Sequence, residues 1–414
     1  MRILFVTHKF WPSLGGTQRL AYGVATGLAE RGNDVTVVTS TAGSFSNDEW
    51  HGGIHIRRFR RVNILAKRPW YVTPGMVLAA MGGEWADYDV VHAFHFVTFQ
   101  ALFGAFHTRL TKTRFVLTPS FHPWKGAYET VVAKRVIRRA DALVAQCLQE
   151  RAQLSSFVPS SKITTIPCGV DKAQFRRMDG IDLRSRLGFA SSDKVILYVG
   201  DVGGHKSVSK LVSIMPEILK GVPEARLLLI GGGSGHRDLR ALASSLGVEQ
   251  SVRVTGQLSD EEVSSAFRQS DAFAMPSENE SFGIVLLEAA VSGLPIVSTP
   301  VGVAPELVKP GSNGFVTESC DSEFAGRVIE VLRDGALKDG ARKMAPALLD
   351  KYSWNSIAAS HEALYRRLLD ESGRVAVSPP LRPAPRAAQG VTQVRWQDSG
   401  PRPTETKRKG GSFR

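Results

Sequence analysis

The chain has 414 residues, which is long enough for two domains with large cores. Its apolar fraction is 43% and its formal net charge is +13. Its three cysteines (Cys147, Cys168 and Cys320) are far apart and form no Cys-x-x-Cys pair, which excludes a disulfide framework or a zinc pattern and is typical of a reducing cytosol. No stretch approaches 18 apolar residues, so we expect no membrane-spanning helix, and the first apolar run is too short for a signal peptide.

The positive charge is concentrated towards the two ends of the chain. Residues 1–180 carry 23 Lys and Arg against 12 Asp and Glu, and residues 375–414 carry 8 against 2. A basic first half indicates an anionic partner, such as nucleic acid, an anionic membrane surface, or a phosphorylated lipid or sugar. Because the sequence has no zinc finger, basic heptad region or RNA-recognition signature, we expect no nucleic-acid partner.

The first half of the chain alternates strands and helices. An apolar strand at residues 2–6 leads through Gly15 and Gly16 into an amphipathic helix at 17–29, and the next strand follows at 35–39. The two glycines permit a close backbone approach, but they do not form the G-x-G-x-x-G pattern of a dinucleotide site. Later elements are predicted as strands at 54–62, from 90, at 115–118, 142–145 and 163–166, and as a helix at 128–140.

Two basic clusters in this half each have two interpretations. One lies at a strand end beside Trp70 and Tyr71, and the other follows one helix face by i, i+4 spacing. Each is either an ordinary solvated surface or an interface with an anionic membrane or acceptor. The clusters are Arg57, Arg58, Arg60 and Arg61, and Lys134, Arg135, Arg138 and Arg139.

His92 and His95 lie at the far end of the strand that starts at residue 90, where parallel sheets bind ligands, so one of them could line a cleft. Without a third ligand nearby, zinc is not expected. The Asp87-x-Asp89 pattern before this strand is predicted to be a turn, not a metal site.

The second half starts a new series of strands after a predicted linker at 171–192. Ser259-Asp-Glu-Glu262 is a capping box that predicts a helix start, and a final helix is predicted from Tyr352 to about residue 369. Residues 373–414 are rich in Pro, Arg, Ser and Gly and have few large apolar residues, so we expect a disordered basic tail. The predicted strands are 195–199, 226–230, 252–256, 296–298 and 314–316.

The stretch from Pro276 to Val308 carries the most specific pattern, in which Glu280-Ser-Phe-Gly-Ile precedes an apolar helix containing Glu288. A helix that starts near Gly283 has free N–H groups and a dipole that favour an anion, and glycine lets a phosphate come close. Glu288 lies roughly 6 Å further along the axis, so its carboxylate could accept hydrogen bonds from the ribose of a nucleoside diphosphate. Glu280 would lie on the other side of the phosphates, near the transferred group. The alternative is a buried strand and helix with two surface acids.

This pattern resembles the signature of glycosyltransferase family 4, in which two Glu are separated by seven residues. Gly293, Pro295 and Gly302-Val-Ala-Pro-Glu306 are also similar to that family. The resemblance covers residues 1 to about 370 and implies the GT-B fold, an α/β fold of two Rossmann-like doubly wound domains facing across a cleft. The implied units are an acceptor-side domain (1–170), a linker (171–192), a nucleotide-sugar-binding domain (193–352) and a helix (353–372) that crosses back to the first domain.

The same resemblance implies roles for single residues. Lys206 would hold the diphosphate, Glu280 the sugar and Glu288 the ribose, and His122 would lie near the sugar and the acceptor. The remaining donor-binding residues are Gly16, Ser281, Phe282, Gly283 and Ile284. The sequence departs from the family pattern where Asp201 replaces a common Arg, Ser207 a common Gly and Cys168 a common Asn, and His122 stands two residues beyond the usual histidine position.

We therefore expect a retaining, metal-independent transferase that moves a hexosyl or related sugar from a nucleotide-sugar to an acceptor, with no other cofactor. A lipid-linked acceptor and a glycan acceptor are both compatible with the sequence. Two other functions stay open: a nucleotide-sugar epimerase, and a non-catalytic nucleotide-sugar-binding subunit, which the replacement by Asp201 makes conceivable. The expected location is the cytoplasm, with peripheral association with the inner face of a membrane as a further hypothesis.

Overall fold

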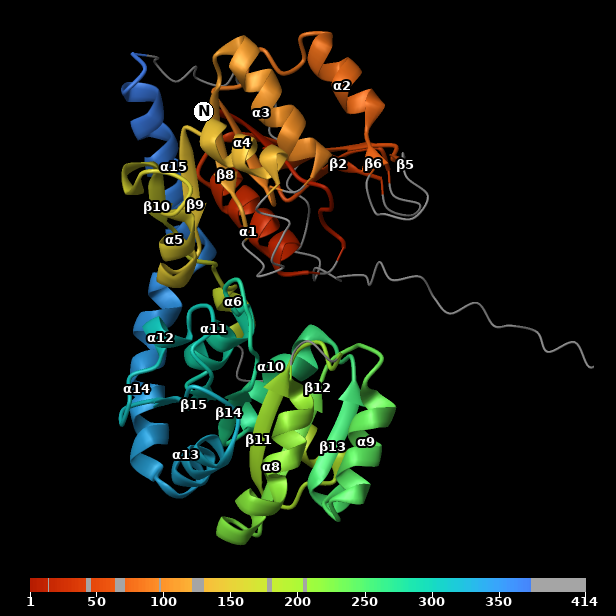
Figure 1. Ribbon diagram of the computed structural model, residues 1–414, viewed down its shortest axis with the longest axis vertical. Coiled ribbons are helices and arrows are strands. Elements are labelled where there is room, and N and C mark those ends of the chain that lie inside the picture. The colour runs from red at the N-terminus through yellow and green to blue at the C-terminus, as the bar shows by residue number, and fades with distance from the viewer. Residues whose placement is uncertain are drawn as a thin grey trace, which may run out of the picture.

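The structure, a computed structural model, describes residues 1–13, 15–41, 46–63, 71–96, 98–120, 130–176, 181–203 and 207–373. These residues form two α/β domains, one above the other in Figure 1, and each is built on its own mainly parallel sheet. The predicted fold class is thereby confirmed. The predictions for His122, Lys206, Trp70 and the tail beyond residue 373 lie outside the described residues.

The first domain contains an eight-stranded sheet in the order β10-β9-β8-β7-β1-β2-β4-β3. Neighbouring strands are parallel except β3 and β4, which form an antiparallel edge. The central strands are buried on both faces, which is why their sequences are almost continuously apolar. The strands are β1 (Arg2–Val6), β2 (Asp34–Ser40), β3 (Asp48–His51), β4 (Ile54–Phe59), β7 (Val90–Phe94), β8 (Arg114–Thr118), β9 (Ala142–Ala145) and β10 (Ile163–Thr165).

Helices cover both faces of this sheet, as the alternation along β1 shows. Ile3 and Phe5 share a core with helix α1, whereas Leu4 and Val6 share the opposite core with α2, α3 and α4. A separate two-stranded sheet joins β5 (Val62–Asn63) to β6 (Tyr71–Val72). The helices of this half are α1 (Gly16–Glu30), α2 (Pro74–Met81), α3 (Phe99–Thr111), α4 (Val131–Arg139), α5 (Leu148–Leu154), α6 (Lys172–Arg176) and α7 (Leu183–Leu187), with one 3-10 turn, η1 (Ser160–Lys162).

The second domain contains a six-stranded parallel sheet in the order β13-β12-β11-β14-β15-β16. The capping box predicted at Ser259 and Glu262 is confirmed at the start of α10. The strands are β11 (Lys194–Val199), β12 (Ala225–Ile230), β13 (Val252–Gly256), β14 (Ala272–Met275), β15 (Ile296–Ser298) and β16 (Gly314–Val316). The helices are α8 (Val208–Gly221), α9 (His236–Ser245), α10 (Asp260–Gln269), α11 (Ile284–Val291), α12 (Ala304–Leu307), α13 (Ser322–Arg333) and α14 (Gly335–Lys351), with the 3-10 turn η3 (Glu249–Ser251).

The last helix, α15 (Trp354–Asp370), runs back along the first domain (Figure 1). A Cβ atom placed on Gly23 of α1 would lie 2.2 Å from the Trp354 ring, so only glycine allows this approach. His92 is fully buried beneath α15, where its Nδ1 lies 2.6 Å from the hydroxyl of Tyr365 and its Nε2 lies 2.8 Å from that of Thr118. Of the two histidines predicted as candidates to line the cleft, His92 is therefore excluded, because both of its ring nitrogens are used in the core.

The first two arginines of the basic cluster after residue 56 are ion-paired within the first domain. Arg58 is buried and pairs with Glu49 at 2.6 Å, while Arg57 pairs with Asp48 and Glu84. The strand also ends earlier than predicted, at Phe59 instead of residue 62. Across the described ranges, no helix combines the length and the apolar character that crossing a bilayer requires.

Candidate active site between the two domains

The loop between β14 and α11 begins where a central strand of the second sheet ends. Gly283, the residue before α11, has a φ of 80°, a left-handed conformation that a side chain disfavours. Phe282 is buried, and its carbonyl accepts the N–H of Val303 at 2.8 Å. A Cβ atom on Gly302 would lie 2.2 Å from that carbonyl oxygen. The segment around Gly302 and Val303 therefore packs against the loop and fixes its position. The first N–H groups of α11 are fixed with it.

Glu288 is buried inside α11 and forms an ion pair with a residue of the other domain. Its exposed fraction is 5%, and its Oε1 lies 3.1 Å from Nη1 of Arg19 on α1. The Nη2 atom of Arg19 lies 3.3 Å from Oδ1 of Asp260 on α10. The pKa of Glu288 is raised overall, because burial raises it more than the Arg19 guanidinium lowers it, and the Asp260 carboxylate also raises it. The arginine thus opposes the effect of burial and favours the ionised form of the carboxyl group.

Residues of the first domain contact the start of α11 and the two loops beside it. A Cβ atom on Gly16 would lie 3.7 Å from Cδ1 of Ile284, so the glycine turn before α1 faces the first residue of α11. The Sγ of Cys147 donates to the carbonyl of Ser281 at 3.4 Å. Gln149 accepts the N–H of Gly302 at 2.8 Å through its side-chain carbonyl. The two domains therefore meet around the loop that contains Ser281 and Gly283.

A second acid of the loop, Glu278, connects it to the start of α8. Its Oε1 accepts the Ser207 hydroxyl at 3.1 Å and the Lys210 ammonium at 2.8 Å. These hydrogen bonds lower the pKa of Glu278. Ser207 has a φ of 53°, which explains why glycine suits this position in the family pattern and why a serine there gains from a side-chain partner.

Asp201 and Glu280 lie around Tyr198, at the end of β11. Burial, together with the charges of Glu280 and Asp201, raises the pKa of the Tyr198 phenol. The exposed Asp201 carboxylate accepts the N–H of Gly203 at 2.5 Å, and its Oδ1 would be 2.6 Å from a Cβ atom on Gly233. The Asp201 side chain is therefore engaged with its own loop and with the neighbouring glycine-rich loop.

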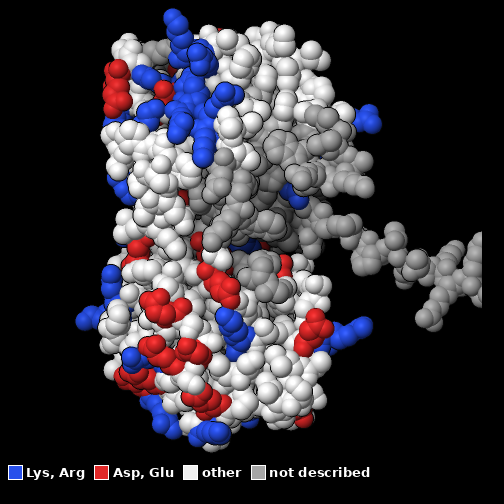
Figure 2. Space-filling view, viewed as in Figure 1, with Lys and Arg blue, Asp and Glu red and all other residues white. Residues whose placement is uncertain are grey.

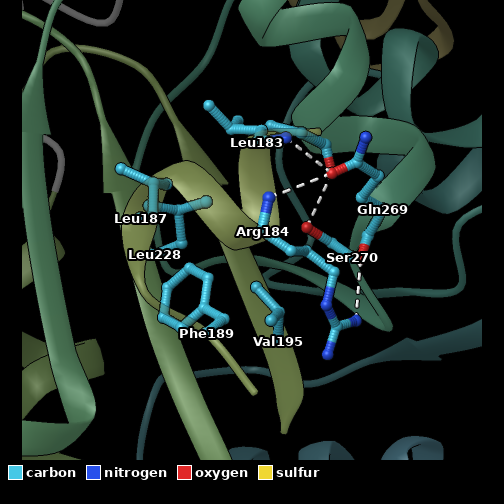
Figure 3. Close-up of a pocket in the computed structure, with 9 residues that line it drawn as sticks. Leu183, Arg184, Leu187, Phe189, Val195, Leu228, Gln269 and Ser270 are labelled. Carbon is cyan, nitrogen blue, oxygen red and sulfur yellow. Dashed lines mark hydrogen bonds between the residues drawn. The ribbon is translucent and has the colours of Figure 1, made fainter. Parts of the chain in front are cut away.

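A small internal pocket lies away from this site, between the linker helix α7 and α10 (Figure 3). Its volume of about 10 Å³ has room for no ligand larger than water. The side-chain carbonyl of Gln269 accepts the N–H groups of Leu183 and Arg184 at 3.0 and 3.1 Å. Arg184 in turn donates to the Gln269 carbonyl and to Asp271. This region is a joint that attaches the linker to the second domain.

The structure brings most of the described candidate residues together at one place. Gly16 faces Ile284, the loop of Ser281, Phe282 and Gly283 lies between the domains, and Glu288 points to α1. Sequence reasoning missed Arg19, which follows the glycine turn by three residues and pairs with Glu288 and Asp260 of the other domain. It also treated Asp260 as a capping-box residue only. In the described part of the chain, no cluster of three or more His, Cys, Asp or Glu could hold a metal ion.

Comparison with known proteins identifies the family of the chain. A family model described as Glycosyltransferase Family 4 matches residues 14–174, and one described as Glycosyl transferases group 1 matches residues 181–347. D-inositol 3-phosphate glycosyltransferase of Actinosynnema mirum is 30% identical over 321 residues, which cover 72% of this chain and 77% of that protein.

Two solved structures share the fold. Sucrose-phosphate synthase from Thermosynechococcus elongatus has a TM-score of 0.71 at 21% identity, covering 89% of this chain and 99% of that chain. HepE of Anabaena in complex with UDP has a TM-score of 0.71 at 19% identity, covering 89% of this chain and 100% of that chain. The chain therefore belongs to glycosyltransferase family 4 and is a sugar-transferring enzyme with the GT-B fold.

Proposed function

We propose that this glycosyltransferase moves a hexosyl or related sugar from a nucleotide-sugar to an acceptor, with retention of anomeric configuration and without a metal ion or other cofactor. The buried carboxylate of Glu288 carries the proposal. Its Oε1 is bound by Arg19, whereas its Oε2 accepts no hydrogen bond from the described residues. The second carboxylate oxygen of a largely buried side chain gains from donors, and the adjacent hydroxyls of a ribose would supply them. The UDP held by HepE supports a nucleoside diphosphate as the ligand of this fold.

The proposed reaction balances without a separate protein nucleophile. The bond between the anomeric carbon and the diphosphate oxygen breaks, and its electron pair stays on the diphosphate. The acceptor oxygen then bonds to the same face of the sugar and passes its proton to the departing phosphate. The first N–H groups of α11 and Lys206 would stabilise the leaving group, Glu280 would hold the sugar hydroxyls, and His122 would lie near the acceptor.

The arrangement favours transfer over the two alternative functions. An epimerase needs extra acid–base carboxylates in the site, but Glu288 and Glu278 are both bound to cations. A non-catalytic subunit was suggested by Asp201, whose carboxylate is occupied by the N–H of Gly203. Incubation of the donor without an acceptor tests this choice, because only an epimerase converts the donor to an isomeric nucleotide-sugar.

We further propose that the acceptor is lipid-linked and is reached at the anionic inner face of a membrane. Leu102, Phe106 and Leu110 form an apolar stripe along α3, and they are 38%, 58% and 68% exposed. Figure 2 shows Lys and Arg gathered over α3 and α4 on the first domain. Among the described residues, no acid forms an ion pair with the basic side chains of this surface that we name the outer basic face: Arg109, Lys112, Lys134, Arg135 and Arg138. Apolar side chains beside unpaired cations suit an anionic bilayer.

The function is tested by binding and turnover. UDP, GDP, ADP and their sugars are screened by thermal shift with the wild type, Glu288→Gln and a surface control, Glu330→Gln on α13. We expect one nucleotide to raise the Tm of the wild type and the control, and to bind Glu288→Gln about 10- to 100-fold more weakly, since a hydrogen bond to a charged group contributes about 1.5–3 kcal/mol. Equal binding by Glu288→Gln would contradict the proposed ribose site.

A further inference from the structure

Arg19 occupies a position in helix α1 at which a positive charge does not stabilise the helix. It lies in the first turn of α1, where its N–H donates to the carbonyl of Gly15 at 3.0 Å, and that turn contains no acidic residue. A cation at the positive end of a helix is unfavourable. Its charge is compensated by Glu288 and Asp260, which both belong to the other domain. Two acids that compensate the charge of Arg19 are therefore brought to it by the meeting of the two domains.

The ion pair with Arg19 leaves one carboxylate oxygen of Glu288 able to accept hydrogen bonds from a ligand. Arg19 uses one carboxylate oxygen, Oε1, and the second oxygen accepts no hydrogen bond within the described ranges. Without the arginine, burial would favour the neutral acid, which accepts hydrogen bonds poorly and can donate only one. The arginine therefore makes Glu288 a better acceptor and fixes the direction in which Oε2 points.

Asp260 connects this ion pair to the joint between the domains. It is the first residue of α10, and Gln269, the last residue of α10, holds the linker helix α7 (Figure 3). Arg19 therefore binds both the ribose-site carboxylate and the helix that anchors the linker.

We propose that Arg19 is a positioning residue, supplied by the first domain, that favours the charged form of Glu288 and orients its carboxylate for the ribose of the donor. The donor site is then complete only when the two domains are together. This inference rests on the proposed function of Glu288 as the ribose ligand. The opposing hypothesis is that Arg19 occupies the place of the ribose and must leave before the donor binds.

The test measures nucleotide affinity by calorimetry between pH 5 and 9 for the wild type, Arg19→Gln, Arg19→Lys and Asp260→Asn. The nucleotide is whichever of UDP, GDP and ADP binds the wild type. Arg237→Gln on α9 is the matched control, because this exposed arginine lies outside the site. Circular dichroism and Tm establish that each variant is folded.

The expected pH dependence follows from the ionised form of Glu288 being the one that binds. Affinity is full above the pKa of Glu288 and is lost as the pH falls through it. Removing Arg19 raises that pKa, so Arg19→Gln should lose affinity at a higher pH than the wild type and should bind about 10-fold more weakly at neutral pH. Arg19→Lys should restore part of both properties. Asp260→Asn removes a charge that raises the pKa of Glu288, so its loss of affinity should not move to higher pH.

Three outcomes would overturn the inference. Tighter binding by Arg19→Gln would show that the arginine competes with the ribose. An unchanged pH profile accompanied only by a lower Tm would show that Arg19 has a merely structural role. If no nucleotide binds the wild type, the proposed function fails and this inference fails with it, which separates that case from the first two.

Discussion

The region around the β14–α11 loop of the second domain and the outer basic face of the first domain differ in how their charged side chains are paired. Around the loop, Glu288 is bound by Arg19, Glu278 by Lys210 and Asp201 by a backbone N–H. On the outer basic face, Lys134, Arg135 and Arg138 form no ion pair with the described acids and stand beside an exposed apolar stripe on α3. In the first region each acid has at least one partner within the protein, whereas in the second region the cations are left to solvent.

This difference suits two kinds of recognition. A single small ligand is bound best by groups that are already oriented, because no ordering cost is then paid on binding. A bilayer presents many equivalent headgroups, so it needs charge and apolar area more than fixed geometry. The three predictions below test whether the two regions really differ in this way.

The largest effect is expected on the outer basic face. Replacing Lys134, Arg135 and Arg138 by alanine should lower partition onto phosphatidylserine-containing vesicles about 100-fold, at roughly 1 kcal/mol per cation. Adding Arg139→Ala should change less than each of the other three substitutions, because Arg139 lies 3.6 Å from Asp141, which offsets part of its charge. Vesicle sedimentation at low and high salt measures the effect.

Two comparisons control this experiment. Vesicles of phosphatidylcholine alone should bind the wild type and the triple variant equally weakly. A triple variant of exposed lysines on the second domain (Lys220, Lys309 and Lys343 to alanine) should partition like the wild type. Equal losses in both triple variants would mean that net charge, not the outer basic face, directs binding.

A smaller effect is expected from disturbing the region around the β14–α11 loop. In Gly302→Ala the new Cβ would lie 2.2 Å from the Phe282 carbonyl at a φ of 53°, so the loop must shift. We expect a loss of about 2–3 kcal/mol in the free energy of unfolding, together with weaker nucleotide binding. Gly311→Ala is the control, since Gly311 also has positive φ but has no atom within 4 Å of its added Cβ, and it should lose only about 1 kcal/mol. Urea denaturation that finds equal losses would refute the rigid-loop description.

The smallest effect is expected at Asp201. Asp201→Asn keeps an oxygen that can accept the N–H of Gly203 and removes one exposed charge. Nucleotide affinity should therefore rise by less than about 3-fold, as for other solvent-screened charges. A rise above 10-fold in calorimetry would instead mean that the carboxylate faces the diphosphate when the ligand is bound.

Much of the fold could be predicted from local patterns. Buried parallel strands appear as short apolar runs, and the capping box at Ser259 marks the start of α10 because both of its hydrogen bonds are local. The start of α11 could also be predicted locally, because the glycine before it and the apolar run after it are adjacent in the sequence. Strand ends were less certain, since β4 stops at Phe59 where neighbouring strand pairing ends and not where the alternation of residues ends.

The sequence by itself therefore determined the alternating α/β architecture, the motif around Glu280 and Glu288, and the membership of a sugar-transferring family, because these depend on residues close together in the chain. Only the tertiary structure decided that Arg19 binds Glu288, 269 residues away, and that His92 belongs to the core beneath α15. It also separated the paired Arg58 from Lys134, Arg135 and Arg138 of α4, which form no ion pair with the described acids. A charge pattern cannot make that distinction, because the acid that neutralises a cation or the ring that covers a histidine is brought to it by folding.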